Sequence, residues 1–314
     1  MEKYTFSQMI YNLADKFILS TFKRVDYHRQ IGELYLDYEK SKMQELEKII
    51  PSSSKDFYKE SLKEPSIKAY LEVQGQTAII DLDIAGYDVK KELDKSLAAS
   101  FSNGLTFYLV KLVDNLIDQK ESDVGYISEL LNGFLHLYKT KGNDEYLKGL
   151  FNKKDILFTG EIISNLLNTE YLHNLPSHYE TLEFLVNSEI QNHGAKSNLE
   201  KYNAVSDIGK YSAKLVVDLL SDYFPEFREK MEKHYFSKGR AANIFDDIKD
   251  FKLDRDNGDG YTHQALPLLC AGFGKEFAKS FIYLKPKSQW RYFNFLLLGA
   301  LFQAQEAVGL KTRS

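Results

Sequence analysis

The sequence predicts an all-α fold, and three observations carry this prediction. Stretches rich in leucine, with apolar residues three and four positions apart, recur along the chain, which is the spacing of amphipathic helices. The six prolines lie between these stretches rather than inside them. No repeat, low-complexity tract or long polar linker divides the 314 residues. We therefore expect a single helical domain over residues 1–314, with roughly ten or more helices.

The individual elements follow from the same spacing. One segment, Ala69–Ile84, is less clear. Its β-branched residues alternate in part with polar ones, which would allow a short hairpin. We nevertheless expect helix or irregular structure there. The polar stretches Pro51–Lys55 and Gln191–Lys201 are expected to be loops. The clearest predicted helices are Ile127–Tyr138, Ile156–Leu167, Tyr179–Val186, Ile208–Leu220 and Tyr292–Val308.

Composition excludes several classes of protein. A net charge of −4, with lysine and arginine spread along the chain, is unlike a nucleic-acid binder. Phe293–Phe302, the longest apolar run, is too short to span a membrane. The polar N-terminus differs from a secretory signal and the single Cys270 forms no internal disulfide, so we expect a cytoplasmic protein. Tyr292–Val308 could line either the core or a homodimer interface.

An acidic stripe lies on one predicted helix within Gly239–Gly260, which reads GRAANIFDDIKDFKLDRDNGDG. At about 100° per residue, four carboxylates and one amide share an arc of roughly 100°. Like charges at such spacings repel unless something neutralises them, and Mg²⁺ prefers oxygen ligands of this kind. A solvated acidic surface explains this segment equally well when it is taken alone. The residues of the stripe are Asn243, Asp246, Asp247, Asp250 and Asp254.

A second group of carboxylates ends an otherwise apolar helix, Leu105–Asp118, which reads LTFYLVKLVDNLID. Asp114 and Asp118 are four residues apart and therefore share one face. Ionised carboxylates are rarely buried unless they are paired or bind a metal. The alternative is a helix end that emerges into solvent. Two such motifs on separate helices favour a shared metal site more than either motif alone.

At these residues the chain resembles the class I isoprenoid synthases, in which two facing aspartate-rich helices hold magnesium ions around a prenyl diphosphate. The DNLID sequence of Asp114–Asp118 is similar to the first motif of bacterial large-terpene synthases of the tetraprenyl-β-curcumene synthase type. Their second motif has aspartates at four-residue steps followed by Arg and Gly-Asp. Here the matching residues are Asp246, Asp250, Asp254, Arg255, Gly258 and Asp259. The likeness is confined to these motifs and their flanking helices.

The resemblance implies a helical bundle around a central apolar cavity and a site that holds about three Mg²⁺ ions. Asp114, Asp118, Asp246 and Asp250 would be the leading ligands and the catalytic residues. Asp247, Asp254 and Asn243 would be further ligands, and Arg240 and Arg255 would bind diphosphate oxygens. The aromatic candidates for the cavity wall are Phe107, Tyr108, Phe245, Tyr292, Phe293 and Phe295.

The implied activity is that of a terpene synthase or cyclase, a carbon–oxygen lyase that ionises a linear prenyl diphosphate and forms a terpene hydrocarbon or alcohol. Two alternatives stay open. One is a prenyltransferase of the chain-elongating or head-to-head type. The chain lacks the arginine-rich segments of elongating enzymes, and Asp246 stands where phytoene synthases have arginine, so this alternative is less favoured. The other is a helical binding protein without catalytic activity, whose acidic faces are solvated or meet a basic partner.

Overall fold

The computed structural model describes residues 6–118, 123–143, 145–256, 261–262 and 265–307. Within its helices, the side chains of residues 6–19, 118, 250, 252–256, 298–299 and 301–307 lie outside the description. The described residues form helices and no strand, which confirms the predicted all-α class. The elements are α1 (Phe6–Leu46), α2 (Lys55–Ser61), α3 (Pro65–Ile84), α4 (Leu93–Asp118), α5 (Val124–Lys139), α6 (Glu145–Leu150), α7 (Lys154–Leu166), η1 (Leu175–His178), α8 (Tyr179–Gly194), α9 (Asn198–Tyr223), α10 (Phe227–Asp256), α11 (Leu266–Ile282) and α12 (Pro286–Ala307).

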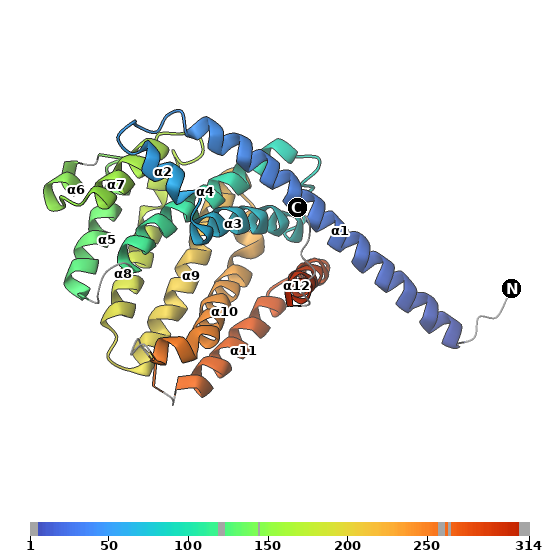
Figure 1. Cartoon of the computed structure of the whole chain (residues 1–314). Helices are drawn as coiled ribbons and strands as arrows, with labels where there is room; N and C mark the ends of the chain where they lie inside the picture. Colours follow the sequence, from blue (N-terminus) through green and yellow to red (C-terminus); the bar gives the residue numbers. More distant parts are fainter. Residues whose placement is uncertain (1–5, 119–122, 144, 257–260, 263–264, 308–314) are drawn as a thin grey trace.

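The helices form one bundle, from which the N-terminal part of α1 projects (Figure 1). Helices α5, α8, α9, α10 and α11 lie side by side in that order, and α4 packs against α9 with α3 beside it. Among the residues that the structure describes, no helix is long and apolar enough to cross a bilayer.

One local expectation is confirmed and one changes. Segment Ala69–Ile84, for which helix or irregular structure is preferred to a hairpin, belongs to helix α3, and every residue from Ala78 to Ile84 is buried. The apolar and β-branched residues of this second half therefore reflect burial on all sides of a helix rather than the two faces of a strand. The predicted loop Gln191–Lys201 is shorter than expected, because α8 continues to Gly194 and α9 begins at Asn198. Ser197 caps α9 by accepting a hydrogen bond from the backbone N–H of Glu200.

Helices α9 and α10 touch backbone to backbone at two glycines. A Cβ atom added to Gly239 would lie 2.1 Å from the carbonyl oxygen of Gly209, and one added to Gly209 would lie 2.4 Å from the carbonyl oxygen of Gly239. Real Cβ atoms do not approach so closely. The pair thus fixes the position of α10, which carries the acidic stripe, against α9.

Buried ion pairs join α3 to its neighbours. Asp81 accepts hydrogen bonds from Lys238 Nζ at 2.6 Å and from the hydroxyl of Tyr235, both on α10. Asp83 contacts Arg24 and His28 of α1 at 3.2 and 3.0 Å. Removing one partner from such a pair leaves an uncompensated buried charge, at a cost of about 3–5 kcal/mol. These contacts hold α1, α3 and α10 in register.

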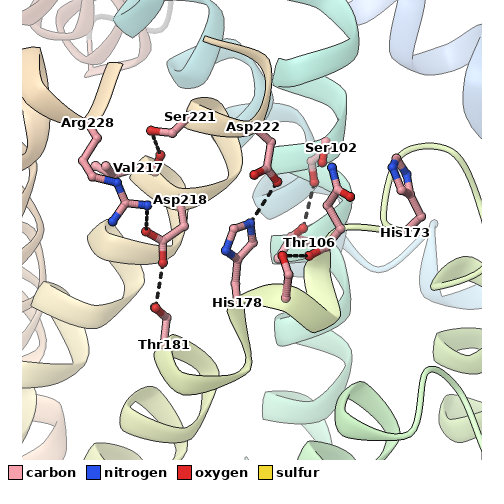
Figure 2. A network of polar contacts seen from close by, with 12 residues as sticks. Ser102, Thr106, His173, His178, Thr181, Val217, Asp218, Ser221, Asp222 and Arg228 are labelled. Atoms are coloured by element: carbon pink, nitrogen blue, oxygen red, sulfur yellow. Dashed lines mark hydrogen bonds and ion pairs between the residues drawn. The ribbon is translucent and has the colours of Figure 1, made fainter. Parts of the chain in front are cut away.

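A further polar network anchors the start of α8 to α9 and α10 (Figure 2). Asp218 accepts hydrogen bonds from Thr181 of α8 at 2.7 Å and from Arg228 of α10 at 2.7 Å. Beside it, His178 of η1 contacts Asp222 at 2.9 Å. The network therefore ties α8, α9 and α10 together at the end of α8 that is remote from Asn192.

Candidate functional site

A cavity of about 320 Å³ lies between α4, α5, α8, α9 and α10, with Tyr70 of α3 at its side. It contains side chains from both aspartate-rich segments. Asp114 comes from α4, while Asn243, Asp246 and Asp247 come from α10. The apolar lining residues are Phe107, Val110, Val113, Ile117, Leu131, Phe134, Leu135, Tyr138, Leu182, Leu185, Val186, Val205 and Ile208, and the remaining polar ones are Lys111, Glu189, Asn192 and Ser212.

The lining changes from apolar to polar along α8, where it runs from Leu182 near the anchored end to Glu189 and Asn192 near the other end. On α4, the side chain of Asp114 is 33% exposed and lies between the buried lining residues Val113 and Ile117. On α10, the Asp246 side chain is 70% exposed. The two carboxylates are therefore accessible to solvent, while most of the apolar lining is buried.

The helical wheel accounts for the α10 side chains. Asn243, Asp246 and Asp247 share one face of this continuous helix, while Ile244 is buried in a separate small core. Tyr261 belongs to that core and donates a hydrogen bond from its hydroxyl to Asp247 Oδ2 at 2.7 Å. Because Tyr261 is buried, it fixes the direction of the Asp247 carboxylate.

Asp114 has a cationic neighbour. Lys111, one helical turn earlier on α4, donates a hydrogen bond to Asp114 Oδ2 and lies 5.6 Å from the centre of the Tyr70 ring. Burial raises the pKa of Tyr70, and the charges of Lys111 and Asp114 then act on it in opposite directions. Asp246 and Glu189 raise the same pKa further. The Tyr70 hydroxyl therefore lies in the electrostatic field of both aspartate motifs.

Sequence reasoning missed five polar residues of this cavity: Tyr70, Lys111, Glu189, Asn192 and Ser212. Only Lys111 stands out in the sequence, since it is the one charged residue among the first nine of Leu105–Asp118. The other four lie on α3, α8 and α9, which reach the site only through tertiary packing. Asn192 Oδ1 is buried and has no hydrogen-bond partner among the described residues, so it offers an acceptor within the cavity.

Several predicted site residues are not placed. Asp118, Asp250, Asp254 and Arg255 belong to α4 and α10, but their side chains lie outside the described part of the chain. Arg240 is described and does not line the cavity. Its guanidinium lies 3.8 Å from Asp207 of α9 and 4.0 Å from Glu276 of α11. A contact of Arg240 with diphosphate stays a prediction, and in this structure its guanidinium contacts the neighbouring helices instead.

Of the six aromatic residues predicted for the cavity wall, Phe107 lines it and the other five do not. Tyr108 is buried beside Ser61 and Tyr58. Tyr292 packs between His234 and Phe281, with Phe295 beside it. Phe245 and Phe293 point outward and are 50% and 43% exposed. The rings that do line the wall with Phe107 are Phe134, Tyr138 and the partly exposed Tyr70.

The oxygen ligands of this cavity suit magnesium better than a metal that requires a complete set of protein ligands. No three His, Cys, Asp or Glu side chains converge as a complete metal site among the residues described. Mg²⁺ commonly uses one or two carboxylates and takes its remaining ligands from waters and substrate phosphates. Asp114 of α4 and Asp246 with Asp247 of α10 would hold such ions from two sides of the cavity. The four lining carboxylates outnumber the single lysine, which favours cations in this cavity.

Comparison with known proteins identifies no relative of this chain. No family model matches the chain, and neither a curated protein nor a solved structure shows a significant match. The functional argument therefore rests on the cavity and its residues.

Proposed function

We propose that this protein is a magnesium-dependent terpene synthase that ionises a linear prenyl diphosphate and releases diphosphate. The observation that supports the proposal best is the shared cavity. Asp114 of α4 and Asn243, Asp246 and Asp247 of α10 line the same cavity, and most of its other lining side chains are apolar. Ionisation of an allylic diphosphate needs both parts: cation-binding oxygens at the leaving group, and an apolar space that excludes water from the carbocation.

Each part of the cavity has a defined role in this proposal. Bound Mg²⁺ would supply Lewis-acid stabilisation of the negative charge that develops on the leaving diphosphate. Asp114, Asp246 and Asp247 would hold the ions through carboxylate oxygens, with Asn243 contributing its amide oxygen. The Tyr261 hydroxyl keeps Asp247 oriented for this task. Lys111 Nζ, beside Asp114, is placed to donate a charge-assisted hydrogen bond to a phosphate oxygen.

The prenyl chain would occupy the apolar interior. Phe107, Phe134 and Tyr138 are almost fully buried and line this part of the cavity. Their rings can stabilise a carbocation through cation–π contacts, which strengthen when water is excluded.

The distribution of positive charge favours one diphosphate over two. Lys111 is the one lysine or arginine among the described residues that line the cavity. A prenyltransferase must bind a second diphosphate substrate, whose phosphates require further cationic groups. Ionisation of a single substrate therefore fits the described cavity better than chain elongation or head-to-head condensation.

The test is diphosphate release by the purified full chain with Mg²⁺ and a series of linear allylic diphosphates from geranyl upward. The proposal predicts release from one substrate alone, abolished by EDTA and reduced on the order of 100-fold in Asp246→Asn. Asp94→Asn is the matched control, because Asp94 lies in the first turn of α4, at the end opposite Asp114. Release that requires added isopentenyl diphosphate would instead identify a prenyltransferase. If neither condition gives release, the synthase proposal fails.

A further inference from the structure

Helix α11 is apolar on its outward side as well as on its buried side. Its buried residues are Leu269, Gly272, Glu276 and Ser280, and its main neighbour is α10. At about 100° per residue, the opposite half of the helix carries no charge over roughly 160°. A surface helix normally presents polar residues there. The residues on this outward half are Leu266, Pro267, Cys270, Ala271, Gly274, Phe277, Ala278, Phe281 and Ile282.

The apolar face extends onto the adjoining segments. Ile282 is 71% exposed and Phe277 36%, and the exposed Tyr283 and Phe293 continue the surface toward α12. In the other direction, Phe273 contacts the exposed Phe245 of α10, with ring centres 5.4 Å apart. Figure 1 shows α11 at the outer edge of the helix row. We call the exposed apolar residues of α11, with Tyr283 and Phe293, the α11 face.

Within the α11 segment itself, the exposed charges have one sign. Between residues 266 and 297 the chain has five basic residues and one acidic residue, although the whole chain carries a net charge of −4. The acidic residue, Glu276, is buried and accepts a hydrogen bond from Lys279 at 2.8 Å. Lys275, Lys285 and Lys287 are exposed beside the apolar residues. On the side of α11 and α12, the α11 face is therefore an apolar surface with a border of lysines.

We propose that the α11 face binds the surface of a membrane that contains anionic lipids, with the apolar side chains entering the headgroup region and the lysines contacting lipid phosphates. Apolar and aromatic side chains next to lysines are the composition of helices that lie in the membrane interface. Basic residues near such a surface contribute by attraction to anionic lipids. The proposal concerns binding alone and does not depend on the proposed catalytic activity.

A second copy of the chain fits this surface less well. In a two-fold symmetric dimer the same patch meets itself, so the lysine border of one copy would lie near that of the other. The segment offers no exposed acidic side chain to neutralise them. Lysine is also depleted in protein–protein interfaces. Anionic phosphates, in contrast, complement the border directly.

The experiment is flotation of the full chain with vesicles of phosphatidylcholine alone or of phosphatidylcholine mixed with phosphatidylglycerol. We expect binding to the anionic vesicles that weakens as salt is raised. Lys285→Gln with Lys287→Gln should weaken it roughly ten- to thirtyfold, at about fivefold per charge. Phe277→Gln with Ile282→Gln should also weaken it.

A control variant shows whether a loss of vesicle binding is specific to the α11 face. Leu199→Gln with Lys233→Gln removes an exposed apolar residue and an exposed lysine from other helices, and it should leave vesicle binding unchanged. Circular dichroism verifies the fold of each variant. The proposal is overturned if the protein does not float with anionic vesicles, or if the control variant weakens binding as much as the α11 variants. It is also overturned if light scattering shows a dimer that Phe277→Gln with Ile282→Gln dissociates, because a second copy then covers the face.

Discussion

Replacing Gly239 with alanine should destabilise the protein, although alanine is the better helix former by about 1 kcal/mol. The new methyl group would lie 2.1 Å from the carbonyl oxygen of Gly209 and 2.6 Å from the Cβ of Ala213. Neither neighbour can move without moving helix α9, because one is backbone and the other is attached directly to it. Overpacking of this kind costs about 1–3 kcal/mol, and backbone contacts place the cost at the upper end.

The net effect can be expressed as a melting temperature. Subtracting the helix-propensity gain leaves a destabilisation of about 2 kcal/mol. Globular proteins gain about 2.1 cal/mol/K of unfolding entropy per residue, so over the whole chain this loss lowers Tm by about 3 °C. Differential scanning calorimetry measures the shift. Since Asn243 lies one turn beyond Gly239, the variant should also reduce any Mg²⁺-dependent activity.

Gly274→Ala is the matched control. Gly274 lies within α11, and an added Cβ there would meet no atom within 4 Å. The substitution should therefore raise Tm by about 1 °C through helix propensity alone. If Gly239→Ala raises Tm by as much as Gly274→Ala does, α9 and α10 do not touch at these glycines and the argument for a fixed α10 fails.

Three further results are expected. Burial raises the pKa of Glu39 to about 7, so its ionisation destabilises the fold as pH rises from about 4.5 to about 7. In urea melts, Glu39→Gln should therefore be more stable than wild type by up to about 3 kcal/mol at pH 8, and by little below pH 5. Burial and the charge of Lys238 lower the pKa of His234 to about 4. The contribution of the neutral imidazole to stability is therefore present above about pH 6.5 and falls by up to about 3 kcal/mol toward pH 4. A His234→Gln variant that loses as much stability as wild type over this range would contradict that assignment. Tyr261→Phe should lower stability by about 1 kcal/mol and weaken Mg²⁺-dependent diphosphate binding. Equal binding in the variant and the wild type would show that Tyr261 does not position Asp247.

The fold class and one half of the site could be predicted from sequence because both depend on local periodicity. Apolar spacing identifies helices wherever one face is buried, and a single helical wheel places Asn243, Asp246 and Asp247 together. The same wheel puts Phe245 about 200° from Asn243, which is the signal that excludes it from the cavity. Aromatic chemistry and proximity to the motifs in sequence carry no such information on direction, so they predict the wall poorly.

The remaining features depend on which helices meet. Tyr70, Glu189 and Asn192 reach the cavity because α3 and α8 pack beside α4 and α9, and no local pattern in the sequence fixes those neighbours. The pattern of Ala69–Ile84 is ambiguous for a related reason. Where a helix is buried on all sides, as from Ala78 to Ile84, it loses the polar face that normally distinguishes it from a strand.

The central claim is that the two aspartate motifs act together on one magnesium–diphosphate group, and a double-mutant cycle on binding tests it most directly. Calorimetry would measure the Kd of a non-ionisable prenyl thiodiphosphate, with and without Mg²⁺, for wild type, Asp114→Asn, Asp246→Asn and the double variant. The proposed site predicts Mg²⁺-dependent binding and a coupling energy above about 1 kcal/mol, because either loss removes part of the same set of ligands. Additive effects of the two substitutions, or equal binding without Mg²⁺, would contradict a shared site.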